Sequence, residues 1–149
     1  MADGDSPYDL DRFVEAQAES YERALAEIRG GRKRTHWMWY VFPQLAGLGM
    51  SEMSRRYAIS GVDEARAYLA HPVLGPRLLA CAEAAAAVEG RSAREVFGAP
   101  DDLKLRSCAT LFAAASAPGS VFDRVLTKFW GGERDAATVR LLAAHPQSP

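Results

Sequence analysis

Apolar residues recur at every third or fourth position along most of the chain, which is the spacing that favours helices. The first run predicts one helix from Asp9 to Ile28, capped by Asp9 and ended by Gly30 and Gly31. Its apolar stripe consists of Leu10, Phe13, Val14, Tyr21, Leu25 and Ile28. Gln17 falls on the same stripe, so its amide needs a partner either in the core or in a pocket.

Further helical runs follow, most of them opened by a capping side chain and closed by glycine or proline. The expected capping residues are Ser51, Ser60, Ser92, Asp101, Ser120 and Asp135. No stretch alternates strictly between apolar and polar residues, and isoleucine is scarce while alanine is abundant, which disfavours a sheet. The pattern therefore predicts an all-α fold: a single compact domain of about seven to nine helices with no significant sheet.

The length and composition are those of one ordinary domain. The chain has 149 residues, of which 48% are apolar and 25% are charged, so it can bury a core without disulfides or metals. We expect a flexible lead-in at residues 1–8, a single helical domain at 9–145 and a C-terminal tail at 146–149. Cys81 and Cys108 have no second cysteine nearby in the sequence, which favours reduced thiols that pack as small apolar groups.

The start of the chain is acidic, which is the opposite of a secretory or mitochondrial leader. The acidic residues are Asp3, Asp5, Asp9 and Asp11. No apolar stretch reaches the 18 residues typical of a membrane span. We therefore expect a cytoplasmic protein that does not contact a membrane.

The densest group of aromatic residues lies at Trp37–Phe42, directly after the basic run Arg32–Arg34 and His36. Such side chains supply much of a small domain's buried area, and tryptophan and tyrosine each carry a polar atom that needs a partner. One to two helical turns before Pro43 or an extended insert both fit the segment, and we favour the helix. The segment forms either part of the core or the wall of a pocket.

The net charge of the whole chain is −1, but basic residues concentrate between Arg29 and Arg56, where the only acid is Glu52. Guanidinium groups bind phosphates and carboxylates, and the helix that Ser51 opens presents an N-terminus that favours anions. A solvated charged face is the alternative. The neighbouring aromatic residues favour a ligand, because nucleotides are held by stacking surfaces beside cations.

Other chemistry is poorly supported by the sequence. His36, His71 and His145 lack the spacing of metal ligands, and Gly47-Leu48-Gly49 is not a phosphate-binding loop, so we expect neither a metal site nor a cofactor. The net charge and the confinement of the basic residues to one region argue against nucleic acid as a partner.

Several unusual segments follow one another along the chain. They are His36–Gln44, Gly47–Ser51, Ser54–Ile59, Glu64–Leu78, Phe97-Gly98 with Asp101, Lys104-Leu105, Thr110–Phe112, and Phe129 with Gly132 and Asp135. In these segments and their order the sequence resembles the bacterial domain-of-unknown-function family 1810, over roughly residues 12 to 142. The family usually has Ser and Met where this chain has Cys108 and Ala109. The resemblance implies a small, all-helical, single-domain protein and no established activity.

The order of features is similar, more distantly, to that of the NAD- and ADP-ribose-associated helical domains, which cleave N-glycosidic bonds. The shared layout is an aromatic segment with a histidine, a helix that ends in His71-Pro72, then Leu74-Gly75-Pro76-Arg77, Lys104-Leu105 and Lys128-Phe129. The catalytic acid of those domains cannot be aligned residue by residue. No catalytic role is therefore carried over to this chain.

These observations lead to the hypothesis of a domain that binds a small anionic molecule containing a nucleotide or ribose, in a cleft around residues 36–44. If the protein is an enzyme, we expect a hydrolase that acts on an N-glycosidic or ADP-ribose-type substrate. His36 is then the candidate general acid–base, since an unperturbed imidazole titrates near neutrality. The candidate binding residues are Gln17, Lys33, Trp37, Trp39, Gln44, Ser51, Arg55 and Lys104. The alternative is a non-catalytic interaction module, in which the aromatic segment is core and the basic segment contacts a protein partner that the sequence does not identify.

Overall fold

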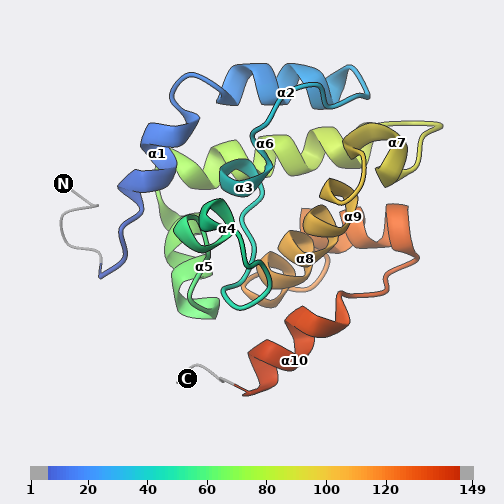
Figure 1. Cartoon of the computed structure of the whole chain (residues 1–149). Helices are drawn as coiled ribbons and strands as arrows, with labels where there is room; N and C mark the ends of the chain where they lie inside the picture. The colour runs from blue at the N-terminus through green and yellow to red at the C-terminus, as the bar shows by residue number, and fades with distance from the viewer. Residues whose placement is uncertain (1–6, 145–149) are drawn as a thin grey trace.

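The computed structural model describes residues 7–144 (Figure 1). Most of the expected lead-in and the whole expected tail at 146–149 therefore lie outside the described residues. Within residues 7–144 the chain forms ten helices and no strand, and seven of the helices have at least seven residues, which confirms the all-α prediction. The helices are α1 (Asp11–Gln17), α2 (Tyr21–Arg29), α3 (Met38–Val41), α4 (Glu52–Arg56), α5 (Val62–Ala70), α6 (Leu74–Ala87), α7 (Ala93–Phe97), α8 (Asp101–Ala114), α9 (Val121–Trp130) and α10 (Ala136–Ala144).

Two 14-residue helices, α6 and α8, organise the packing. Helix α6 contacts α2, α5 and α9, and helix α8 contacts α5, α7, α9 and α10. In Figure 1, α2 runs alongside α6, while the short helix α3 lies in front of it. The aromatic segment, which contains α3, thus lies in the connection between α2 and α4. The longer helices of the fold surround this connection.

A line of aromatic rings runs through the core and joins four helices. Phe13 of α1 meets Tyr68 of α5 with the ring centroids 5.1 Å apart, Tyr68 meets Phe112 of α8 at 5.4 Å, and Phe112 meets Phe122 of α9 at 5.6 Å. All four side chains are almost fully buried. Edge-on and tilted ring pairs of this kind add to the free energy gained from burial.

The prediction of one helix from Asp9 to Ile28 is wrong, because the chain turns between α1 and α2. The hydroxyl of Ser20 donates to the carbonyl of Ala16 at 2.9 Å, and the backbone N–H of Ser20 donates to the carbonyl of Gln17 at 3.2 Å. Serine side chains compete in this way with the regular helical hydrogen bonds. The turn lets α1 pack on α3 while α2 packs on α6.

Four of the seven expected caps, which include Asp9, are confirmed. Ser51, Ser92 and Ser120 each accept a hydrogen bond from the backbone N–H three residues later, and Asp135 does the same for Thr138. Ser92 forms a complete capping box with Glu95.

The other expected caps are wrong, because a different residue precedes the helix. Leu10 precedes α1 in place of Asp9, and no side chain caps that end. Gly61 precedes α5 in place of Ser60, although the backbone N–H of Ser60 donates to Glu64 at 2.8 Å. Asp101 is the first residue of α8 and does not cap it.

Residues 44–59 form a short connection that is closed by backbone contacts. Leu45 and Ile59 form an isolated parallel bridge, in which Ile59 donates to Gln44 and Ala46 donates to Ile59, each at 2.8 Å. None of the helices within residues 7–144 is both long and apolar enough to span a membrane.

Candidate functional site

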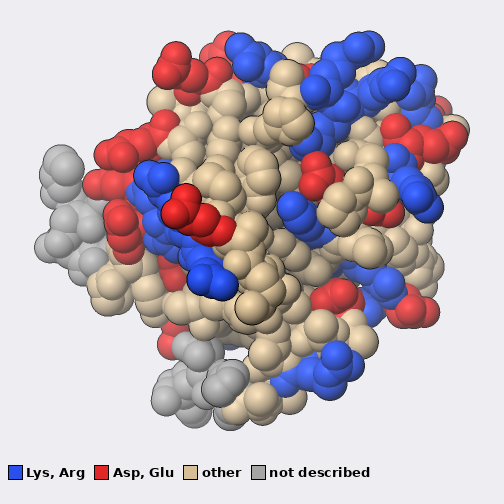
Figure 2. All heavy atoms as spheres, in the orientation of Figure 1, with Lys and Arg blue, Asp and Glu red and all other residues tan. Residues whose placement is uncertain are grey.

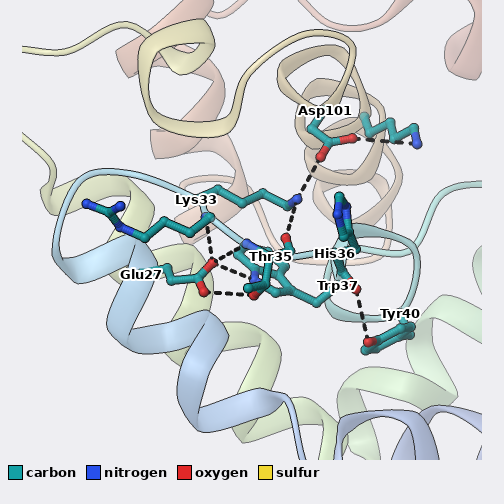
Figure 3. Close-up of polar contacts among 9 residues, drawn as sticks. Glu27, Lys33, Thr35, His36, Trp37, Tyr40 and Asp101 are labelled. Carbon is teal, nitrogen blue, oxygen red and sulfur yellow. Dashed lines mark hydrogen bonds and ion pairs between the residues drawn. The ribbon is translucent and has the colours of Figure 1, made fainter.

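Glu27 of α2 fixes the segment that leads to His36. Its carboxylate accepts hydrogen bonds from the backbone N–H of Arg34 at 2.8 Å and of Thr35 at 3.1 Å. It also accepts from the Thr35 hydroxyl at 2.7 Å and from the Trp37 indole N–H at 2.9 Å (Figure 3). One carboxylate therefore holds both neighbours of His36 in place.

The charge of Glu27 is kept by these hydrogen bonds. Burial raises the pKa of the carboxyl, but the donors on Arg34, Thr35 and Trp37 together outweigh burial and lower the pKa to about 2. Hydrogen bonds to the ionised form are the usual cause of such a low value. Glu27 is consequently a structural anion and not a proton donor near neutral pH.

Lys33 turns inward from the same segment. Its ammonium donates to the carbonyl of Thr35 at 2.6 Å, pairs with Asp101 at 3.0 Å and lies 5.0 Å from the centre of the Trp37 ring. The Lys33 side chain is only 8% exposed, so this ammonium depends on these partners. The backbone N–H of Lys33 donates to the carbonyl of Val96, which ties the segment to α7.

Asp101 links Lys33 to a second lysine on α8. Lys104 Nζ lies 3.6 Å from the other carboxylate oxygen of Asp101 and 5.2 Å from the centre of the Trp39 ring. Two ammonium groups therefore share one carboxylate, and each lies over an indole, as cation–π pairs do. We call Lys33, Trp37, Trp39, Asp101 and Lys104 the Asp101 cluster.

His36 is exposed beside this cluster. Its carbonyl accepts a hydrogen bond from the Tyr40 hydroxyl at 3.3 Å. Figure 3 shows the imidazole on the side of the segment that faces the start of α8. The structure thus brings four predicted site residues, Lys33, Trp37, Trp39 and Lys104, into one cluster next to the candidate acid–base.

Trp37 and Gln17 are core residues. The Trp37 side chain is 1% exposed, and Gln17 is 2% exposed. The Gln17 amide donates to the carbonyl of Tyr40 at 2.7 Å and to the hydroxyl of Tyr68 at 3.0 Å, and its oxygen lies 3.5 Å from Arg77. The hydrogen-bond partners expected for the Gln17 amide are therefore groups of the core.

Replacing Gln17 by alanine should destabilise the protein by about 2 kcal/mol, because it leaves the buried Tyr68 hydroxyl and the Tyr40 carbonyl without their partner. Urea unfolding measures the change, with Glu15→Ala as the control, since Glu15 is exposed on the same helix. A Gln17→Ala protein of unchanged stability that fails to bind a ligand would instead assign Gln17 to a binding site.

Gln44, Ser51 and Arg55 lie on other parts of the described structure. The carbonyl of Gln44 belongs to the bridge with Ile59, and the Ser51 hydroxyl caps α4. Arg55 lines an open depression of about 550 Å³ with Glu52 and Arg56. The contacts described for these residues join them to α4 and the bridge and not to the Asp101 cluster.

A deeper cavity lies against α10. It measures about 320 Å³ and is mostly apolar. Its walls are Leu45, Ala46, Gly47, Ser60, Gly61, Leu141 and Leu142. The cavity contains none of the residues that the sequence nominated for a ligand.

The two cysteine thiols are buried and unreactive near neutral pH. Cys81 and Cys108 are buried free thiols, and burial raises the pKa of Cys81 to about 12 and that of Cys108 well above its ordinary value. Both thiols therefore stay protonated near neutral pH. Among residues 7–144, no three His, Cys, Asp or Glu side chains gather closely enough to hold a metal ion.

Sequence reasoning missed Glu27 and assigned Asp101 only to capping. Glu27 directly precedes the buried Ile28, so it lies at the edge of the apolar stripe of α2. This placement is the local sequence feature that indicates a partly buried glutamate. Asp101 meets Lys33 across 68 positions of sequence, and no fixed spacing indicates such a pair.

The model of the family described as "Protein of unknown function (DUF1810)" matches residues 7–142. The chain belongs to this family. The match spans every helix from α1 to α9 and most of α10, so it includes the Asp101 cluster and Glu27.

A crystal structure of high similarity supports the same fold. The conserved hypothetical protein Rv1873 from Mycobacterium tuberculosis is 54% identical to this member of the DUF1810 family, with a TM-score of 0.90. The alignment covers 93% of this chain and 99% of that protein. Among curated proteins, none matches the chain.

Proposed function

We propose that this protein binds a small anionic molecule, one containing a nucleotide or ribose, at the Asp101 cluster beside His36. The observation that carries the proposal is the sharing of one carboxylate by two ammonium groups, of which Lys104 lies over the half-buried Trp39 ring. Lys33 is held by Thr35 and Asp101 inside the protein, whereas Lys104 is the more exposed of the two ammonium groups and lies further from Asp101. Lys104 is therefore the cation that an incoming phosphate would meet.

The chemistry of each group suits a part of such a ligand. Lys104 is 22% exposed at its side chain and can reach a phosphate, while the Trp39 ring offers a face for a base or sugar. Asp101 is 20% exposed and accepts hydrogen bonds, which ribose hydroxyls donate. Lys33 and Trp37 support these groups from the core.

Hydrolysis of an N-glycosidic bond is the reaction that the resemblance to ADP-ribose-associated domains suggests for this site. In that reaction water adds to the anomeric carbon while the carbon–nitrogen bond breaks, and the bond pair leaves with the nitrogen. His36 would accept a proton from the attacking water, and the departing nitrogen would take a proton from solvent. The exposure of His36 supports the exchange of that proton with water.

Thermal unfolding against ADP-ribose, NAD, nucleotides and inorganic phosphate tests the proposal. A true ligand at about a hundredfold excess over its dissociation constant stabilises the protein by about 2.7 kcal/mol, which raises the Tm by roughly 5–10 °C. Lys104→Gln and His36→Ala should abolish the shift for that ligand. Lys128→Gln, which removes an exposed lysine on α9, should leave it intact.

The panel also gives the outcome that would contradict the proposal. If no compound raises the Tm, or if Lys104→Gln responds like the wild-type protein, the Asp101 cluster is not a ligand site. If a compound raises the Tm but its N-glycosidic bond is intact after incubation with the protein, the protein binds the compound without hydrolysing it.

A second candidate function is a non-catalytic interaction module. It is favoured by the burial of most of the aromatic segment, since Trp37, Met38, Val41 and Phe42 are each at most 2% exposed. In this case Trp39→Ala destabilises the protein, the panel of small molecules is flat, and the partner is a macromolecule. The two candidates are thus separated by the same panel of compounds, with Trp39→Ala added to the variants.

A further inference from the structure

Exposed arginines gather where the loop after α2 meets the start of α7. Arg32 and Arg34 lie on the loop, Arg91 lies just before α7, and Arg94 lies within it, and all four are exposed. Figure 2 shows a concentration of basic side chains over this corner of the molecule, above the position of α7 in Figure 1. We call these four residues the arginine surface.

Hydrogen bonds to two backbone carbonyls hold the two segments together. The N–H of Lys33 donates to the carbonyl of Val96 at 2.7 Å, and the guanidinium of Arg91 donates to the carbonyl of Gly31 at 3.2 Å. Gly31 is buried with φ at +80°, a conformation that glycine adopts readily, so the loop turns tightly against Arg91. The arginine surface is therefore a fixed feature of the fold.

The basic residues of the loop differ in their exposure to solvent. The Lys33 side chain is 8% exposed and points to Asp101, whereas its neighbours Arg32 and Arg34 are exposed. Neither arginine contacts a residue of the Asp101 cluster in the described structure, so what binds them is independent of the proposed ligand.

These arginines are left without ion pairs within the described part of the chain. Arg106, Arg124 and Arg134 pair with carboxylates at 2.8, 2.7 and 2.5 Å. Among residues 7–144, no carboxylate lies within 4.0 Å of the guanidinium group of any of the four arginines of the surface. The nearby Glu95 accepts hydrogen bonds from Ser92 in the capping box. The guanidinium forks of Arg32, Arg34 and Arg94 are thus available for an outside anion, while that of Arg91 is partly engaged by Gly31 and by the charge of Glu95.

We propose that the arginine surface docks an acidic segment of a protein partner, whose carboxylates pair with the guanidinium groups. Guanidinium binds carboxylate in a bidentate manner with matched geometry. A nucleic acid is the weaker fit, because single-stranded bases need exposed aromatic rings to stack on. None of the four residues of the arginine surface is aromatic, and the half-buried Trp39 ring belongs to the Asp101 cluster.

The net charge of −1 supports the same choice. The four arginines contribute four positive charges to a chain of net charge −1, so the remainder of the chain is acidic and disfavours a long polyanion that extends beyond the arginine surface. A short acidic segment meets only the favourable charges. Association should therefore be fast, and it should weaken as salt screens the interaction.

Fluorescence anisotropy with a labelled octaglutamate peptide tests this proposal, and an octaglutamine peptide and an eight-nucleotide thymidine strand serve as comparison probes. The triple variant Arg32→Gln, Arg34→Gln and Arg94→Gln should bind octaglutamate at least tenfold more weakly. Arg91 is kept in this variant because its guanidinium supports Gly31. The matched control is Arg66→Gln, Lys128→Gln and Arg140→Gln, which removes three exposed cations from α5, α9 and α10 and should change binding by no more than about twofold.

Three results would overturn the proposal. Octaglutamate could bind no better than octaglutamine, or the two triple variants could bind it equally well. The thymidine strand could also bind more tightly than octaglutamate and lose affinity in the arginine variant, which would assign the surface to nucleic acid. Circular dichroism of both variants confirms that any loss is not a loss of fold.

Discussion

Replacing Glu27 by alanine should destabilise the protein by about 3 kcal/mol, a large effect for a partly exposed helical residue. The change removes an acceptor of four hydrogen bonds from residues 34–37. The Trp37 side chain is 1% exposed, so its indole N–H would be left without a partner at the edge of the core. That desolvation cost adds to the loss of the hydrogen bonds themselves, and the position of His36 should loosen as well.

The low pKa of the Glu27 carboxyl should make the free energy of unfolding depend on pH in the acid range. The pKa of Glu27 lies at about 2 in the folded protein, below its ordinary value of 4.5. Its contribution is therefore complete above a pH of about 4.5 and is lost as the pH falls toward 2. With allowance for solvent screening of a partly exposed group, the contribution is about 2 kcal/mol.

Urea unfolding of wild type and Glu27→Gln between neutral pH and about pH 2 measures this contribution, because the glutamine keeps the shape and loses the charge. The difference in unfolding free energy between the two proteins should shrink as the pH falls. Glu22→Gln, an exposed glutamate on the same helix, should follow the wild-type curve throughout. Parallel curves for wild type and Glu27→Gln would show that the ionised Glu27 does not stabilise the fold.

The elements that the sequence predicts correctly are those whose determinants are local. A serine that caps a helix bonds to a backbone N–H only three residues away, so Ser51, Ser92 and Ser120 can be recognised from spacing alone. The turn between α1 and α2 is different. A serine inside an apolar stripe does not by itself predict a break, and the side chain that ends α1, Gln17, is bonded to Tyr40 and Tyr68, which lie 23 and 51 positions further along the chain.

Part of the candidate site was also predictable, because some of its residues are neighbours in the sequence. The coincidence of basic and aromatic residues indicated where cations lie over indole rings, and Lys33 and Lys104 do so. The residue that joins them, Asp101, is adjacent to neither tryptophan in sequence. Glu27 reaches the aromatic segment across a loop, and a loop imposes no fixed spacing on the residues that it brings together.

The aromatic segment itself divides between core and surface with the period of a helix. Trp37, Met38, Val41 and Phe42 are buried, while Trp39 and Tyr40 between them are only half-buried. This pattern repeats after four residues, as expected for the short helix α3. The question of whether the segment is core or pocket wall therefore has a divided answer: Trp37 is core, and Trp39 is the one tryptophan of the pair that can meet a ligand.

Replacing Gly75 by alanine should also destabilise the protein by about 3 kcal/mol and lower the Tm by roughly 6–12 °C. Gly75 lies in the first turn of α6, where a Cβ would overlap the carbonyl oxygen of Leu69 and lie 3.0 Å from its carbonyl carbon. These are backbone atoms of α5 and cannot rotate away. The helices would have to separate, although alanine is the better helix former by about 1 kcal/mol.

Gly30→Ala is the matched control, since Gly30 ends α2 in a right-handed conformation and its Cβ would come no closer than 3.3 Å to another atom. It should change the Tm by a few degrees at most. If Gly75→Ala melts like Gly30→Ala, then α5 and α6 can part at this end without cost, and the close approach does not stabilise the fold. If only Gly75→Ala is destabilised, the segment Leu74-Gly75-Pro76-Arg77 is explained by helix packing. It then lends no support to a shared catalytic layout with the ADP-ribose-associated domains, and the case for a ligand rests on the Asp101 cluster alone.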